Sequence, residues 1–377
     1  MQVKKRDLPL VIGFCAVLIG LQAAFWVLPK QEFSVNEKRV LQEFPEWRWS
    51  NLWSGKWFQS IDDYLSDHFA QRDFWVGVHA YTQQAEGLNS AGKVYRGKEG
   101  WLINRPIEAG AVFEKNIQTI REFAEKHPEE DFSFLCVPTT GAIMTDKLPD
   151  LHESYPDAAL LQQMEAEYAG TMQWIDVMEV LQNATDTPIY YRTDHHWTSL
   201  GAYEVYCALA QAWGLTSAEK EEYSIDDYDG FYGTTYSKSG LWATKPDEIS
   251  LWTDTETQID VTAYDENRPV PIEQEGPFFL EHLQEADKYP VFLDGNHAKV
   301  TLTSNAPGGK LLIVRDSFAH CFAPFLSRHY QTIDLVDLRY FKKQTVSELI
   351  EENEYDRILF VYGLETLTSD RSIQWLA

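Results

Sequence analysis

The chain has 377 residues, of which 32 are Lys or Arg and 58 are Asp or Glu, so its formal net charge is −26. With 44% hydrophobic and 14% aromatic residues it can bury a core, which excludes a wholly disordered chain. The acidity argues against a protein that binds nucleic-acid phosphates by bulk charge, so no nucleic-acid partner is expected.

Residues 8–28 form an uncharged run in which Gln22 is the only clearly polar side chain. At about 1.5 Å rise per residue, a helix of this length spans roughly 31 Å, close to the hydrocarbon thickness of a bilayer. Lys4, Lys5 and Arg6 precede the run, which predicts a cytoplasmic tip and a single membrane anchor within residues 1–29. The remaining chain is then extracytoplasmic, with a net charge of −28. A cleaved signal peptide is the alternative, since length alone does not separate the two.

Residues 30–92 are rich in tryptophan and phenylalanine and predict a helical aromatic arm. Within it, residues 57–69 place apolar side chains at helical spacing. Two interpretations are open: the aromatic side chains stack on sugars, or they pack against the main domain.

Residues 93–377 alternate between apolar strands and amphipathic helices. Strands are expected at 131–138, 171–177, 311–314, 332–337 and 358–362, and helices at 114–127, 157–168, 200–213, 318–330 and 345–354. Such alternation predicts a three-layer α/β/α sandwich with a mostly parallel sheet.

An insertion of loops and irregular β-structure is expected at residues 217–290, which hold 18 acidic and 5 basic side chains. The run Asp226-Asp227-Tyr228-Asp229-Gly230 does not have the spacing of an EF-hand calcium loop, so a solvated acidic segment is the simpler interpretation.

Two stretches carry residues suited to catalysis. Asp194 and His196 are two positions apart, so a carboxylate can hold the imidazole and fix its tautomer. Ser317 lies where an apolar strand turns into a helix, which is the setting of a nucleophile elbow. A serine nucleophile needs a base, and the base needs an orienting acid, so the three residues together make a candidate acyl-transfer site.

The stretch Thr193-Asp194-His195-His196-Trp197-Thr198 resembles the signature of the DHHW family of exported bacterial proteins. That family is similar to the alginate O-acetyltransferases and to other SGNH-hydrolase-like proteins. Further matching stretches are Gly97–Leu102, Val137–Thr139, Tyr232–Gly240, Gly295–His297 and Val314–Ala319. The chain order Asp, His, Ser is that of the acetyltransferase relatives. One departure is that Arg315-Asp316 precedes the serine, where many relatives have glycine or threonine.

The resemblance implies an SGNH-like fold in which Ser317 is the nucleophile, His196 the base and Asp194 the group that orients His196. It implies O-acetylation of a cell-surface or exported polysaccharide through an acyl-serine, with a membrane-bound protein as acyl donor. The alternatives are a carbohydrate acetylesterase that uses the same three residues, and a non-catalytic glycan-binding surface protein.

Other residues near these stretches have less specific predicted roles. Asn296 is a candidate oxyanion donor or a turn residue, and Arg315 a candidate substrate contact or ion-pair partner. His195 is a candidate substrate or oxyanion contact, or else a packed or hydrogen-bonded neighbour of the site. A metal ligand is the less favoured alternative, because two adjacent histidines are expected to point in different directions and no further metal ligands are evident. Asp316 is expected to cap the following helix. No metal and no cofactor are predicted, and the acidic insertion favours a neutral or cationic glycan.

Overall fold

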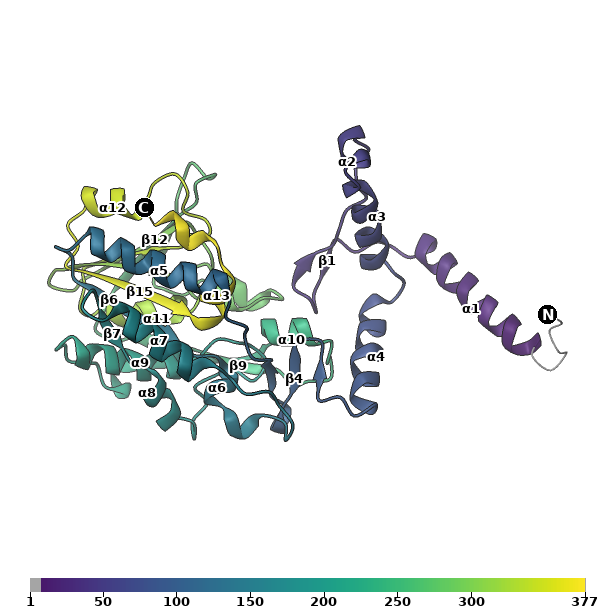
Figure 1. Ribbon diagram of the computed structural model, residues 1–377, viewed down its shortest axis with the longest axis horizontal. Coiled ribbons are helices and arrows are strands. Elements are labelled where there is room, and N and C mark those ends of the chain that lie inside the picture. The colour runs from purple at the N-terminus through teal and green to yellow at the C-terminus, as the bar shows by residue number, and fades with distance from the viewer. Residues whose placement is uncertain (1–7, 377) are drawn as a thin grey trace. The chain divides into compact units, whose positions relative to one another are not determined.

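The computed structural model describes residues 8–376. The chain divides into two compact units, of which the first holds the residues up to Ala91 together with Gly240–Trp242, and the second holds the rest. Lys4, Lys5 and Arg6, on which the predicted orientation depends, lie outside the described residues. Figure 1 shows the elements of both units along the chain.

The first unit begins with a single long apolar helix, α1 (Leu8–Val27). It is the one helix in the described chain that is long and apolar enough to cross a membrane, although a signal sequence would meet the same test. The elements that follow are β1 (Phe33–Ser34), β2 (Arg39–Val40), α2 (Trp49–Trp53), α3 (Lys56–Asp67), α4 (Arg72–Ala85) and β3 (Ser90–Ala91).

The second unit is built on an eight-stranded sheet in the order β11-β10-β12-β14-β13-β15-β6-β7. The five strands from β14 to β7 are parallel, and β12, β10 and β11 extend the sheet in antiparallel fashion. The bounds are β6 (Phe132–Val137), β7 (Gln173–Ile175), β10 (Ile259–Tyr264), β11 (Ile272–Glu275), β12 (Lys299–Ser304), β13 (Lys310–Arg315), β14 (Thr332–Val336) and β15 (Arg357–Gly363).

Helices cover both faces of this sheet, as the apolar central strands require. Alternate side chains of β13 belong to two separate cores: Leu311 and Ile313 to one, Leu312 and Val314 to the other. The first core contains α9 (Ser199–Ala212) and α11 (Ala319–Leu326), and the second contains α5 (Ala111–Lys126), α7 (Asp157–Tyr168), α12 (Val346–Glu352) and α13 (Leu364–Ser369). The predicted three-layer α/β/α fold with a mostly parallel sheet is confirmed.

Further strands and short helices complete the second unit. They are β4 (Val94–Arg96), β5 (Leu102–Asn104), α6 (Thr140–Ile143), α8 (Met178–Asn183), α10 (Thr234–Ser239), β8 (Tyr223–Phe231) and β9 (Asp247–Asp254).

The prediction that residues 217–290 form irregular structure is wrong in part. β8 and β9 make an antiparallel hairpin, and β10 and β11 join the main sheet. The reason is a period of two: in β10, Ile259, Val261 and Ala263 are buried while Asp260 between them is exposed. Acidic side chains therefore occupy the solvent face of regular strands.

Candidate active site

Ser317 lies in a tight turn between β13 and α11, two residues before the helix begins. β13 is a central parallel strand, so the turn is at the carboxyl edge of the sheet, where open α/β folds bind their ligands. The side chain of Ser317 is only half-buried, although both of its chain neighbours are buried. The strand thus delivers a hydroxyl group to the surface from a rigid core.

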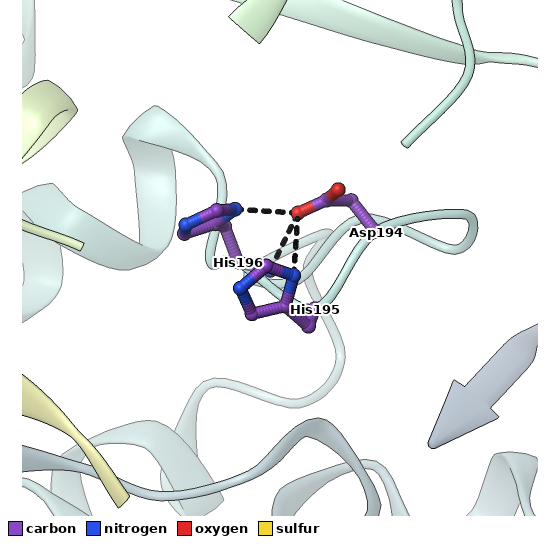
Figure 2. Close-up of side chains that lie close together, drawn as sticks. All are labelled: Asp194, His195 and His196. Atoms are coloured by element: carbon purple, nitrogen blue, oxygen red, sulfur yellow. Dashed lines mark hydrogen bonds and ion pairs between the residues drawn. The ribbon is translucent and has the colours of Figure 1, made fainter. Parts of the chain in front are cut away.

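Asp194 and His196 lie in the loop before α9, which is closed by a bridge between Tyr190 and Trp197. Oδ1 of Asp194 accepts hydrogen bonds from the backbone N–H of His196 at 2.9 Å and from its ring Nδ1 at 2.6 Å. Nε2 of the same ring lies 2.7 Å from Oγ of Ser317. Figure 2 shows dashed lines from one carboxylate oxygen of Asp194 to both histidines. The three residues form one hydrogen-bonded line, with Nε2 free of the N–H proton and facing the serine.

The second carboxylate oxygen of Asp194 accepts the backbone N–H of Thr234 at 2.6 Å. Burial alone would raise the pKa of Asp194, but His195, His196 and these hydrogen bonds hold it well below its usual range. The carboxyl is therefore ionised and suited to stabilise a protonated His196. The approach of the Thr234 segment depends on Gly233, because a Cβ there would lie 2.1 Å from Cβ of Asp194.

A second buried carboxylate, that of Asp247, holds the loop that carries Asp194. Oδ2 of Asp247 accepts the N–H of Thr193 at 2.8 Å and its hydroxyl at 2.6 Å, and Oδ1 pairs with Nε of Arg192 at 3.0 Å. The Thr193 hydroxyl in turn accepts the N–H of Gly233 at 3.0 Å. Asp247 comes from β9, so the acidic insertion contributes directly to the geometry around Asp194.

Aromatic rings enclose His196. Tyr289 stacks on the imidazole with ring centroids 4.1 Å apart and planes 13° from parallel, and Phe318 lies at 4.8 Å in a tilted arrangement. The hydroxyl of Tyr289 donates to the carbonyl oxygen of Ser317 at 3.3 Å. Trp197 donates its indole N–H to the carbonyl of Phe318 at 3.1 Å, which ties the histidine loop to the serine turn.

His195 is a neighbour of the site whose ring has its own partners. Its Nδ1 lies 2.7 Å from Oγ1 of Thr234 and 3.4 Å from Oδ1 of Asp194. Burial and the nearby His196 lower the pKa of His195 to about 4, so its ring is neutral at pH 7.

A metal ion is the competing use of this cluster. Ligand atoms of Asp194, His195 and His196 lie within 4.8 Å of one another, and all three are drawn in Figure 2. A cation held by Oδ1 of Asp194 and Nδ1 of His196 would have to displace the 2.6 Å hydrogen bond between them. The same three groups therefore suit either a metal or the oriented base.

Arg315 and Asn296 each have a partner other than the residues around Ser317. Arg315 is fully buried, with Nη1 3.3 Å from Oδ2 of Asp337, so the geometry favours the ion-pair alternative. Its Nη1 also lies 2.5 Å from Nε2 of His320, whose pKa is held well below its usual range by burial and by Arg315. Asn296 is exposed and its Oδ1 accepts a hydrogen bond from Arg339 at 3.1 Å.

The prediction that Asp316 caps the following helix is wrong, because α11 begins at Ala319 with Phe318 as its N-cap and has no side-chain cap. Oδ1 accepts the N–H of Phe318 at 3.0 Å, inside the turn that carries the serine. Oδ2 accepts the N–H of Gly363 at 2.8 Å and the hydroxyl of Thr366 at 2.6 Å. Both oxygens of the Asp316 carboxylate therefore have partners, and the side chain joins the serine turn to the end of β15.

Sequence reasoning missed Asp247, Tyr289 and Thr234. Only Thr234 carried a signal, because it lies in the Tyr232–Gly240 stretch that resembles the family. Asp247 and Tyr289 lie in the insertion and become recognisable only when the chain is folded.

Comparisons with known proteins agree with this architecture. Residues 94–245 match a family described as the SGNH hydrolase-like domain of the acetyltransferase AlgX, a range that contains Asp194 and His196 and ends before Ser317. No curated protein matches the chain.

Two solved structures share the fold. A DHHW family protein from Eubacterium siraeum has a TM-score of 0.65 at 23% identity, over 73% of this chain and 90% of that one. Bacillus cereus PatB1, solved with a sulfonyl adduct, has a TM-score of 0.62 at 19% identity, over 74% of this chain and 97% of that one. The predicted resemblance to DHHW and SGNH-hydrolase-like proteins is confirmed, and at these identities the structures establish the fold.

Proposed function

We propose that this protein is an O-acetyltransferase, anchored in the membrane by α1, which transfers an acetyl group to a carbohydrate outside the cytoplasm by way of Ser317. The observation that carries the proposal is the line from Asp194 through His196 to Ser317, with contacts of 2.6 and 2.7 Å. The match to the acetyltransferase AlgX domain supports the reaction class.

In the first half-reaction, Nε2 of His196 removes the proton of Ser317 as Oγ attacks the carbonyl carbon of an acetyl donor. The tetrahedral intermediate collapses, the bond to the leaving group breaks, and the protonated His196 returns its proton to that group. Asp194 stabilises the imidazolium that forms in between. The product is an acetyl ester on Ser317.

In the second half-reaction, His196 takes the proton of a sugar hydroxyl as its oxygen attacks the acetyl carbon. The bond from that carbon to Oγ of Ser317 then breaks, and the protonated His196 returns the proton to Oγ. Within residues 8–376, no acceptor is found for the backbone N–H of Ser317. We assign this N–H to the oxyanion, in place of the Asn296 side chain that the sequence suggested.

Several features bear on the substrate. Asp226, Asp227 and Asp229 of β8 are exposed, so the insertion presents negative charge to solvent. Repulsion between like charges disfavours a strongly anionic polymer as acceptor, and a neutral or cationic glycan is proposed. The acetyl donor is proposed to be a membrane-bound protein that delivers the group from the cytoplasmic side.

An acetylesterase with the same three residues would use water in place of the sugar. The two activities separate when the full chain, in detergent micelles, is given an aryl acetate with and without neutral oligosaccharides. Transfer predicts acetylated sugar by mass spectrometry, whereas free acetate alone indicates an esterase. If Ser317→Ala releases the phenol as fast as wild type, the serine mechanism is wrong and a non-catalytic role gains support.

A sulfonyl fluoride is a second probe, because PatB1 has been solved with a sulfonyl adduct. The proposed mechanism predicts covalent labelling of Ser317, and much slower labelling in His196→Gln, which lacks the base. The exposed Ser54 of the first unit is a matched control and should stay unlabelled.

A further inference from the structure

Large apolar side chains that remain exposed are concentrated in residues 33–88, which lie within the aromatic arm predicted at residues 30–92. This stretch of 56 residues holds 15 of them, whereas the 285 residues from 92 to 376 hold seven. The density in the arm is about ten times higher. Exposed apolar surface gathered in this way marks an interaction site.

The exposed side chains follow the helices in stripes. Phe58 and Leu65 on α3 and Phe69 just beyond it are 56%, 46% and 41% exposed. Their spacing of seven and four residues puts them on one face of a helix. Asp67 is on the opposite face, where it is buried and binds both terminal nitrogens of Arg39 at 2.5 and 2.8 Å. α3 is therefore amphipathic, with its polar side packed and its apolar side open.

α4 repeats the arrangement, with Phe74, Val78 and Tyr81 exposed at a spacing of four and three residues. A groove between the two helices is lined by Leu65, Phe69 and Trp75 among others.

A tryptophan cluster lies next to the N-terminal end of α3, whereas Phe69 lies just beyond its C-terminal end. Trp47, Trp49 and Trp53 are 56%, 65% and 84% exposed, and the ring of Trp47 contacts that of Trp49 with centroids 5.6 Å apart. Residues 38–58, which contain the cluster, hold four basic and two acidic side chains. This stretch is mildly cationic in a chain whose net charge is −26.

α3 contacts the end of α1 through one pair of aromatic rings. The ring of Phe25 meets the ring of Tyr64 edge-on at 6.3 Å, and Lys30 donates from Nζ to the carbonyl oxygen of Phe25 at 2.5 Å. Within α3, Tyr64 is seven residues from Trp57, so roughly 10 Å of helix separates the contact with α1 from the N-terminal end of α3. Trp26, at the end of α1, is itself 75% exposed.

We propose that this part of the aromatic arm, residues 33–88, lies in the interfacial region of the bilayer that α1 crosses. Its apolar stripes and tryptophan cluster would rest among lipid headgroups and the upper parts of the acyl chains. Tryptophan and tyrosine collect at this depth, and helices with one apolar face lie in the plane of the interface. Residues 33–88 as a whole hold five basic and eight acidic side chains, so burial of apolar surface, and not attraction to anionic lipids, carries the proposal. The inference rests on the proposed anchor and is independent of the chemistry at Ser317.

The test uses the full chain in nanodiscs that contain anionic lipid and phospholipid brominated near the glycerol end of its acyl chains, which quenches nearby tryptophans. The emission of Trp47, Trp49 and Trp53 is obtained as the difference between wild type and the triple variant Trp47→Phe, Trp49→Phe, Trp53→Phe. Trp26→Phe reports the end of α1 in the same way. Trp375→Phe is the matched control, because Trp375 is 50% exposed and lies in the second unit.

The inference predicts that the arm tryptophans lose at least half as large a fraction of their emission as Trp26 does, and several times more than Trp375. Quenching of Trp26 with arm emission no more affected than that of Trp375 would overturn it and would indicate a protein partner or a second copy instead. Quenching of the arm without Trp26 would overturn the anchor and, with it, the inference, which places the arm at the bilayer that α1 crosses. Absence of quenching at both would overturn both.

Discussion

Replacing Gly233 with alanine tests whether Asp194 must lie where the structure places it. A Cβ at position 233 would lie 2.1 Å from Cβ and 2.4 Å from Oδ2 of Asp194. Because non-bonded carbon atoms pack at about 3.5 Å or more, the carboxylate has to move by roughly 1 Å. That shift disturbs its 2.6 Å contacts with both His196 and Thr234.

A misplacement of about 1 Å in a catalytic array can cost on the order of 100-fold in rate. Overpacking of this kind costs roughly 1–3 kcal/mol of stability. We therefore expect Gly233→Ala to remain folded and to release phenol from an aryl acetate about 100 times more slowly than wild type. The assay is run on the full chain, with thermal unfolding followed in parallel.

Gly110→Ala is the matched control, since no atom lies within 4 Å of the added Cβ and its φ of −145° suits any residue. It should keep the wild-type rate. A folded Gly233→Ala protein with a rate within about threefold of wild type would refute the proposed part of Asp194 in catalysis.

Three further predictions concern the surroundings of His196. Tyr289→Phe keeps the ring that stacks on His196 and should leave the aryl acetate rate nearly unchanged. Tyr289→Leu loses that aromatic contact and should lower kcat about three- to tenfold. Equal rates in the two variants would show that the ring is not needed. The pKa of His195 is about 4 in the folded protein against an ordinary 6.5, so the unfolded chain takes up this proton first as the pH falls. Stability should drop between about pH 6.5 and 4, by up to roughly 3 kcal/mol, and urea unfolding of His195→Gln should show a shallower drop; the same slope in both proteins would contradict this assignment. Chelation with EDTA should leave the aryl acetate rate unchanged if Asp194 orients His196, and a rate lost with EDTA and restored by zinc would favour a metal at Asp194, His195 and His196.

The sequence predicted the regular part of the fold well because local patterns dominate there. Residues 157–168 were expected as a helix and form α7 with those bounds, and β13 and β15 include the apolar runs expected at 311–314 and 358–362. The prediction for residues 217–290 fails in part because these residues lack a helical period, and regular strands such as β10 are then hard to distinguish from irregular β-structure. Pairing of β10 with β12 depends on residues about 40 positions apart, which no local pattern reveals.

The candidate site likewise divides into residues that local patterns predict and contacts that depend on the fold. Asp194 and His196 could be proposed from their spacing, and Ser317 from its position after a buried strand. Their meeting across 121 positions of sequence depends on the fold of the whole second unit. For Arg315 the sequence leaves a substrate contact and an ion pair open, and the structure favours the ion pair because the side chain is fully buried beside Asp337. Tyr289 could not be predicted, because the residues next to it in the sequence form no motif that indicates stacking on His196.

The most direct test of the central claim is to look for the acyl-enzyme itself. The full chain is incubated with an aryl acetate, quenched in acid and digested, and the acetyl group is located by mass spectrometry. The proposed mechanism predicts acetylation of Ser317 in wild type, none at this position in Ser317→Ala, and much slower acetylation in His196→Gln. Turnover without an acetyl group on Ser317, or with the group on another residue, would contradict it.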